Sequence, residues 1–189
     1  MLFPICRMAA HIEQALGIRA TKHLLNSAGI LRFPEYQQDM VRLGIGLHGV
    51  GVVPEVAQRL AVASTLKTVI SQIKTVPQGA TVGYDRQGVA KQEMRIATIA
   101  LGYADGFSRA LGNGQGSVHI HGQLAPVVGN VCMDMAMVDV TRIAAEEGDE
   151  VVVFGKERPI AEVAAVLNTI PNEVLTNVSE RVKRIYYTG

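Results

Sequence analysis

The pattern of apolar residues changes between Val50 and Leu60, and this change limits the folds that the chain can adopt. After Pro54, short apolar segments typical of β-strands are separated by glycine-rich turns. A helix with Ile160, Val163, Ala164, Leu167 and Ile170 on its buried side is predicted late in the chain, ended by Pro171. Many short strands with regular turns indicate a compact β domain. The predicted strands cover residues 66–73, 81–84, 94–101, 117–120, 136–140 and 150–154.

Before Pro54 the pattern is instead an alternation of helices and strands, which is typical of an α/β barrel or a doubly wound sheet. Apolar residues at helical spacing predict a helix over 5–16, which Gly17 ends. A buried strand over 21–25, a turn over 26–29, a helix over 34–40 and a glycine-rich inner barrel strand over 43–50 are predicted next. Two strands cannot close a barrel. We therefore expect residues 1–55 to form the C-terminal end of a barrel and residues 56–189 to form the β domain.

Composition narrows the class of protein further. The 189 residues suggest one or two domains, and 48% hydrophobic residues can form a substantial core. A formal net charge of +1 argues against a nucleic-acid or membrane partner held by bulk charge. No apolar run reaches the roughly 20 residues that cross a bilayer. Cys6 and Cys132 have no metal or redox spacing, so a cytoplasmic protein with free thiols is predicted.

Five short segments carry a resemblance to a known family. They are HLLNS at 23–27, VRLGI at 41–45, VGY at 82–84, GYADG at 102–106 and VCMD at 131–134. In this order and at these spacings they resemble the C-terminal half of alanine racemase, which interconverts L- and D-alanine for peptidoglycan synthesis with pyridoxal 5'-phosphate (PLP). The resemblance implies the last strand and helix units of a TIM barrel followed by a C-terminal β-domain. It also implies a homodimer.

The resemblance assigns cofactor contacts in the N-terminal part. Ser27 and the backbone N–H groups of Gly44 and Ile45 would bind the phosphate, although Asn-Ser-Ala-Gly is also an ordinary turn. Arg42 would face the pyridine nitrogen. A guanidinium has a pKa above about 12 and only donates hydrogen bonds, so the ring nitrogen would stay unprotonated. Without the resemblance, Arg42 is a surface arginine that closes a helix.

The resemblance assigns catalysis and substrate contacts to the β domain. Tyr84 would act as one of two acid–base groups, opposite a lysine, and would reach into the partner subunit's site. Its pKa, near 10 in a free tyrosine, would have to fall by about three units. Tyr103 and Arg109 would lie at the entrance, and the Met133 N–H would bind the substrate carboxylate. From the residues alone, Tyr84 is a strand tyrosine packed on a glycine turn, and Asp105 and Asp134 cap turns.

The chain also departs from the family pattern. The family's lysine that bonds covalently to PLP lies upstream, and no lysine here matches it: the lysines are Lys22, Lys67, Lys74, Lys91, Lys156 and Lys183. We therefore expect a C-terminal piece of a racemase that neither racemises alanine nor binds PLP covalently by itself. Glu180 replaces a phosphate-binding tyrosine, Asp85 replaces a glycine, and His48 stands where a tyrosine is common. The ending resembles racemases fused behind a Mur-type ligase.

Several alternatives stay open. The β domain could be an autonomous dimerisation or interaction module without catalysis. A related PLP racemase or decarboxylase is a further possibility, but decarboxylases usually place a carboxylate where Arg42 would lie. His119 and His121 on one strand face could form a metal pair, with no third ligand evident, so no metal is predicted. The glycine run from Gly112 predicts a hairpin. Alternation of Arg181, Lys183 and Arg184 beside Tyr186 predicts a solvated strand face.

Overall fold

The computed structural model describes residues 3–187 and divides them into two units. The N-terminal unit consists of residues up to 47 together with 51–60. The β unit consists of residues 48–50 and 61 onward. Each unit has its own internal packing.

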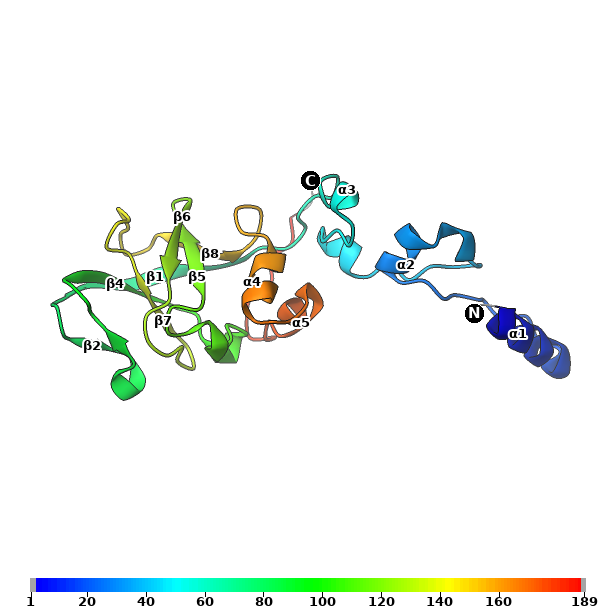
Figure 1. Ribbon diagram of the computed structural model, residues 1–189, viewed down its shortest axis with the longest axis horizontal. Helices are drawn as coiled ribbons and strands as arrows, with labels where there is room; N and C mark the ends of the chain where they lie inside the picture. Colours follow the sequence, from blue (N-terminus) through cyan, green and yellow to red (C-terminus); the bar gives the residue numbers. More distant parts are fainter. Residues whose placement is uncertain (1–2, 188–189) are drawn as a thin grey trace. The chain divides into compact units, whose positions relative to one another are not determined.

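The β unit is built on one antiparallel sheet, shown in Figure 1, with the strand order β6-β5-β8-β1-β4-β7. An isolated bridge between Val127 and Val138 links the segment after β6 to β7, so the two edges of the sheet nearly meet. This arrangement confirms the predicted β domain. The strands are β1 (Leu66–Val76), β4 (Met94–Ile99), β5 (Ser117–Ile120), β6 (Gln123–Pro126), β7 (Ala136–Asp139) and β8 (Glu150–Phe154).

Alternation along the strands decides which side chains form the core. In β5, Val118 and Ile120 are fully buried, whereas His119 between them lies on the opposite face. The same inward face collects Ile70, Phe107 and residues of the two C-terminal helices into one hydrophobic cluster. The predicted strands 117–120 and 150–154 are confirmed to the residue. β1 extends three residues further than predicted, and β4 and β7 end earlier.

The predicted strand 81–84 is shorter than expected. β2 (Thr81–Val82) stops because Gly83 adopts φ +79°, and Tyr84 begins a 3-10 turn, η3 (Tyr84–Arg86). β3 (Gly88–Val89) then pairs with β2 and completes a small hairpin that the sequence did not predict. Figure 1 shows this hairpin beyond β4, at the end of the β unit away from the C-terminal helices. Tyr84 therefore lies in a turn and not on a strand.

Two short helices replace the single helix predicted for 160–170. These are α4 (Ile160–Val166) and α5 (Pro171–Thr176). The helix ends early because Asn168 takes the left-handed conformation, at φ +52°. Pro171 begins the second helix, a position where its missing N–H costs nothing. Ile170, predicted to be buried, is 60% exposed between the two helices.

The N-terminal unit confirms the first predicted helix but not the two strands predicted after it. α1 (Phe3–Leu16) ends at Gly17, whose φ is +63°. The predicted strands 21–25 and 43–50 are not formed: a single parallel bridge joins His23 to Met40, and residues 45–48 form a 3-10 turn, η2 (Ile45–His48). Barrel strands are stabilised by neighbours on both sides, and among the described residues each of these segments has at most one.

Two smaller predictions in this unit also change. The predicted turn 26–29 is the start of a helix, α2 (Ser27–Arg32), because the Asn26 side chain accepts a hydrogen bond from the Gly29 N–H at 3.0 Å. The predicted helix 34–40 is only one 3-10 turn, η1 (Pro34–Tyr36). A short α3 (Pro54–Ala57) was not predicted. Within residues 3–187, no helix is both long and apolar enough to cross a membrane.

Candidate active-site residues

The Ser27 hydroxyl organises the predicted phosphate contacts in the N-terminal unit. Ser27 is the first residue of α2 and is buried. Its Oγ accepts hydrogen bonds from the backbone N–H groups of Gly44, at 2.9 Å, and Gly46, at 3.3 Å. The hydroxyl proton remains available to a further acceptor. The Ile45 N–H makes no hydrogen bond to the residues that the structure describes. The structure thus brings Ser27, Gly44 and Ile45 together.

Arg42 is anchored to the same segment from both its backbone and its side chain. Its N–H donates to the Leu25 carbonyl at 2.8 Å, and its Nη2 donates to the Leu24 carbonyl at 3.1 Å. The Leu25 side chain is buried, and this holds in place the segment to which Arg42 donates its hydrogen bonds. A guanidinium carries five N–H donors, so this contact leaves donors for a ligand. The alternative of a helix-closing arginine is not supported, because no helix ends at Arg42 and its carbonyl partners lie in a segment without regular secondary structure.

The β unit brings Tyr103 and Met133 together on two adjoining loops. Tyr103 belongs to the 3-10 turn η4 (Tyr103–Asp105), and its N–H donates to the Cys132 carbonyl at 3.0 Å. The Ala104 N–H donates to the Met133 carbonyl at 3.0 Å. A Cβ on Gly102 would lie 2.3 Å from the Met133 carbonyl oxygen, so only glycine permits this approach. Both predicted substrate residues stay accessible, Tyr103 at 40% and Met133 at 54%.

Arg109 and Tyr84 lie on other parts of the same unit. Arg109 begins the 3-10 turn η5 (Arg109–Leu111) and is exposed. Its positive charge acts on the Cys132 thiol, although burial dominates and raises the pKa of Cys132 above its usual value. The Tyr84 side chain is 71% exposed, which contradicts the alternative of a tyrosine packed on a glycine turn. Its backbone carbonyl accepts a hydrogen bond from the Asn130 side chain.

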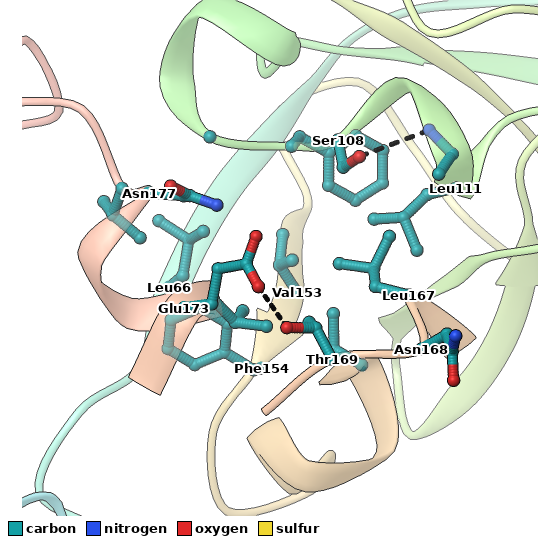
Figure 2. Close-up of a pocket in the computed structure, with 16 residues that line it drawn as sticks. Leu66, Ser108, Leu111, Val153, Phe154, Leu167, Asn168, Thr169, Glu173 and Asn177 are labelled. Atoms are coloured by element: carbon teal, nitrogen blue, oxygen red, sulfur yellow. Dashed lines mark hydrogen bonds between the residues drawn. The ribbon is translucent and has the colours of Figure 1, made fainter. Parts of the chain in front are cut away.

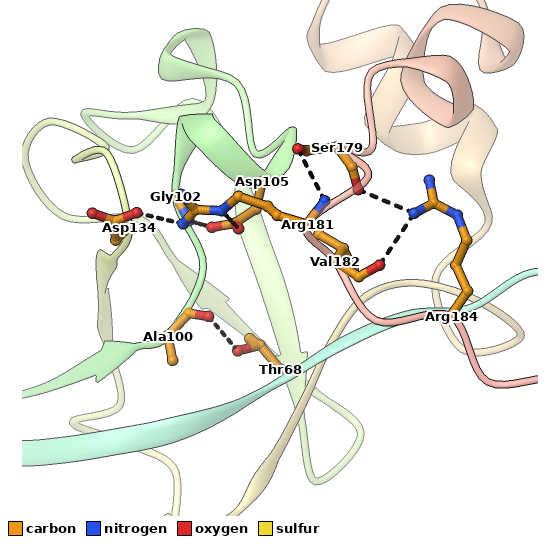
Figure 3. A network of polar contacts seen from close by, with 9 residues as sticks. All are labelled: Thr68, Ala100, Gly102, Asp105, Asp134, Ser179, Arg181, Val182 and Arg184. Carbon is orange, nitrogen blue, oxygen red and sulfur yellow. Dashed lines mark hydrogen bonds and ion pairs between the residues drawn. The ribbon is translucent and has the colours of Figure 1, made fainter.

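Asp105 and Asp134 do more than cap turns. Asp105 is buried and accepts hydrogen bonds from the Gly102 N–H at 2.8 Å and from Arg181 Nε at 2.7 Å. Arg181 also forms an ion pair with Asp134, as Figure 3 shows. Hydrogen bonds to Asp134 and Asp105 raise the pKa of Arg181. The C-terminal segment is thereby tied to the loop that carries Tyr103.

The strand predicted for the basic C-terminal segment is therefore wrong, since residues 181–187 form no strand. Arg184 instead donates to the carbonyl oxygens of Val178, Ser179 and Val182, at 3.0–3.1 Å. These contacts fold the segment back on itself. The sequence gives no local signal for the Arg181 contacts, because Asp105 and Asp134 lie 76 and 47 residues away along the chain.

Two other sequence features take different places than predicted. His121 lies in the β5–β6 turn, with φ +49°, and pairs with Asp149 at 3.2 Å. His119 is on β5, with a buried Nδ1 that finds no partner in the described chain. The glycine run from Gly112 is not a hairpin. It connects η5 to β5, with the Asn113 N–H donating to the Gly129 carbonyl at 2.8 Å.

A cavity of about 280 Å³ lies beside the C-terminal helices of the β unit (Figure 2). Leu66, Phe107 and Phe154 are among its apolar lining residues, and Thr169 and Glu173 are joined by a hydrogen bond at its edge. None of the predicted catalytic, cofactor or substrate residues lines it. The candidate active-site residues lie elsewhere, and most of them are on exposed turns and loops.

Comparisons with known proteins identify the family. The sequence model described as "Alanine racemase, C-terminal domain" matches residues 63–186, and "Alanine racemase, N-terminal domain" matches residues 4–52. The fold and these matches define a chain from a class of PLP-dependent isomerases. It belongs to the alanine racemase family.

Individual relatives agree with this assignment. Alanine racemase 2 of Caldanaerobacter subterraneus subsp. tengcongensis is 41% identical over 182 residues, covering 92% of this chain and 47% of the relative. The alanine racemase from Streptomyces coelicolor A3(2) superposes with a TM-score of 0.89 at 32% identity, over 100% of this chain and 51% of that chain. The Bartonella henselae enzyme, with covalently bound pyridoxal phosphate, gives a TM-score of 0.81 at 32% identity, over 97% and 52%. The chain spans about half the length of these proteins.

Proposed function

We propose that this chain is the C-terminal part of an alanine racemase that interconverts L- and D-alanine as a homodimer with PLP. The observation that carries the proposal is the exposed Tyr84 on a β unit that matches the family's C-terminal domain. A phenol that serves a partner subunit must project from its own unit, and Tyr84 is 71% exposed. We further propose that residues 1–55 supply the end of the barrel with the phosphate site, and that residues 56–189 supply the β domain.

The donor set in the N-terminal unit fits a phosphate and a pyridine ring. Ser27 retains a hydroxyl proton, the Ile45 N–H has no partner in the described chain, and the Gly44 N–H is held beside them by Ser27 Oγ. Arg42 keeps guanidinium donors for the ring nitrogen. When bound, PLP supplies the electron sink that acidifies the substrate α-hydrogen. Arg42, as a donor that does not yield its proton, would limit that sink and favour racemisation over transamination.

The residues of the β unit then take defined tasks in the proposal. The Tyr84 phenol moves a proton on one face of the substrate α-carbon. The Met133 N–H, which makes no hydrogen bond to the described residues, would bind the substrate carboxylate. Tyr103 and Arg109 would narrow the entrance and exclude water. Alanine, with a single methyl group as its side chain, is the substrate class that the family match favours over serine.

We also propose that these 189 residues alone do not attach PLP. A lysine must be neutral to attack the cofactor aldehyde. In the two lysines whose pKa is shifted by a defined partner, the shift is upward and so disfavours the neutral amine. Lys22 donates a hydrogen bond to Glu13 at 2.7 Å, which raises the pKa of Lys22, and Lys67 donates one to Glu150 at 2.8 Å, which raises the pKa of Lys67. Both shifts favour the protonated amine, which is not the form that attacks an aldehyde.

Two measurements test this proposal together. The purified chain is incubated with PLP and reduced with borohydride, and its mass is measured by mass spectrometry. No covalent adduct is expected. The chain is also expected not to racemise alanine. The chain is then joined behind the N-terminal half of the Caldanaerobacter relative, and this chimera should racemise alanine. Replacing Tyr84 with Phe in the chimera should lower turnover in both directions by about a hundredfold or more.

The second candidate is an autonomous module that dimerises or binds a partner without catalysis. It is favoured by one observation: the main hydrophobic cluster lies wholly within the β unit. The chimera separates the two candidates. If Tyr84→Phe leaves both directions at normal rates, the phenol is structural and the module is supported. If the isolated chain forms a PLP adduct and racemises alanine, the proposed dependence on another lysine is wrong.

A further inference from the structure

The turn that carries Tyr84 has a backbone that needs outside support. Asp85 and Arg86, the next two residues after Tyr84, have φ of +59° and +53°. Side chains disfavour this left-handed region, and two consecutive non-glycine residues there are uncommon. Such a conformation persists only where surrounding contacts determine it. Because the Tyr84 ring is itself 71% exposed, packing of the ring does not supply them.

The Asn130 side chain supplies two of these contacts. Its Nδ2 lies 3.3 Å from the Tyr84 carbonyl oxygen and 3.5 Å from Asp85 Oδ2. An amide NH₂ carries two hydrogens, so both acceptors can be served. Aspartate tolerates the left-handed region better than most residues, and here its carboxylate also meets the Asn130 amide.

Asn113 orients the Asn130 amide. Asn113 Nδ2 donates to Asn130 Oδ1 at 3.0 Å, which directs Asn130 Nδ2 toward the Tyr84 turn. The Asn113 backbone is fixed in turn, because its N–H donates to the Gly129 carbonyl at 2.8 Å. The Asn130 amide therefore accepts a hydrogen bond from Asn113 through its oxygen and donates to the Tyr84 turn through its nitrogen.

The backbones on either side of this contact also lie close together. A Cβ on Gly129 would lie 2.6 Å from the Val82 carbonyl oxygen, and one on Gly88 would lie 3.0 Å from the Gly129 nitrogen. Both strands of the β2–β3 hairpin thus contact the segment that carries Asn130, at the residues that flank the Tyr84 turn. A small cluster of Val82, Ile96 and Met137 packs beneath it. The hairpin base is fixed, and the Asn130 contacts extend that order to the Tyr84 turn.

We propose that Asn130, oriented by Asn113, is a positioning residue that fixes the direction of the Tyr84 phenol. It acts through the turn backbone and does not touch the reacting atoms. This inference rests on the proposed role of Tyr84 in racemisation. Its first test does not depend on catalysis, because the order of the turn can be measured in the chain itself.

The first experiment compares backbone ¹⁵N order parameters in the 189-residue chain and its variants. In Asn130→Ala, the values for residues 84–86 should fall from about 0.85 to below about 0.6, while those of β1 and β4 stay unchanged. Asn130→Asp keeps an acceptor for Asn113 but loses the donors and places a second carboxylate near Asp85, so its loss should be at least as large. Asn172→Ala, at an exposed site on α5, is the matched control and should change nothing.

The second experiment uses the same chimera with α-deuterated alanine. With Tyr84 mispositioned, one enantiomer should still exchange its α-deuterium with solvent, through the base on the other face, while inversion slows. Asn130→Ala should therefore raise the ratio of exchange to racemisation about tenfold or more, with KM little changed. A merely destabilised protein would lose both rates together and leave the ratio constant.

The outcomes separate the two proposals. If Tyr84→Phe leaves racemisation normal, the proposed function fails, whatever Asn130 does. If Tyr84→Phe abolishes racemisation but Asn130→Ala matches the control in both order parameters and exchange ratio, the positioning role of Asn130 is refuted. If Asn130→Ala does not fold, Asn113→Ala replaces it, since that variant leaves Asn130 in place but unoriented. A smaller change in the same direction is then expected, and an unchanged turn would overturn the inference.

Discussion

At the scale of single residues, the β unit depends on a buried carboxylate that the sequence presents as an ordinary turn residue. The Asp105 carboxylate accepts hydrogen bonds from the buried Gly102 N–H and from the Arg181 guanidinium. The first bond stabilises the Tyr103 loop from within. The second ties the C-terminal segment to that loop.

Replacing Asp105 with Ala should lower the free energy of unfolding by about 1–3 kcal/mol, because the Gly102 N–H is then buried without an acceptor. Asp134→Asn, which removes only the 54% exposed end of the Arg181 contact, should change it by less than about 1 kcal/mol. Urea unfolding of both variants measures the difference. Equal losses would show that the buried bond has no special weight.

Cys132 provides a pH-dependent test at the same scale. Burial disfavours the thiolate and raises the pKa of Cys132, and the charge of Arg109 opposes this only in part. The folded state therefore prefers the protonated thiol, and its contribution to stability is lost as the pH rises above the thiol pKa of the unfolded chain.

In a Cys6→Ser background, the rate of Cys132 alkylation by iodoacetamide should rise with pH around a midpoint above the value of about 8.5 for a free cysteine. In urea the midpoint should return to that value. A folded-state midpoint below it would mean that Arg109, and not burial, dominates the site.

At the scale of elements, the loops of the candidate site are set by close contacts between backbones. Gly102 has an ordinary extended φ of −139°, yet its Cβ position is occupied by carbonyl oxygens of Cys132 and Met133, at 2.3–2.4 Å. Gly114 is the opposite case, with a φ of +80° and open space around it. The two glycines are needed for different physical reasons.

Gly102→Ala should therefore cost about 3 kcal/mol, because the two loops must separate to admit a methyl group. Gly114→Ala should cost only about 1 kcal/mol, the penalty of a left-handed alanine. Thermal unfolding of both variants tests the ranking. The reverse order would show that the loop formed by residues 131–134 can shift to admit the methyl group at little cost in free energy.

At the scale of the whole molecule, the two units differ in how many hydrophobic side chains they bury. The main hydrophobic cluster runs from Leu66 to Val174 and lies entirely within the β unit. In the N-terminal unit, the apolar stripe of α1 is exposed, with Met8 at 64% and Leu16 at 65%. Burial of apolar area is the main stabilising term in folding, so the β unit should be the more stable part.

A chain of residues 61–189 should accordingly unfold in one cooperative transition, with a melting temperature within about 4 °C of that of the 189-residue chain. Calorimetry of both chains makes the comparison. A truncated chain that shows no transition would mean that the β unit depends on the N-terminal residues for its stability.

The sequence alone determined most strands of the β unit, since period-two alternation and glycine turns are local signals, and it located β5 and β8 to the residue. It did not predict β3 or β6. It also identified Ser27 with Gly44 and Ile45, and Tyr103 with Met133, as groups that the structure brings together. The strand predictions for segments 21–25 and 43–50 were wrong, because strand formation depends on neighbouring strands that the local pattern does not describe. The Asp105–Arg181 bond spans 76 residues and the Asn130–Tyr84 bond spans 46, so only the tertiary structure could decide them.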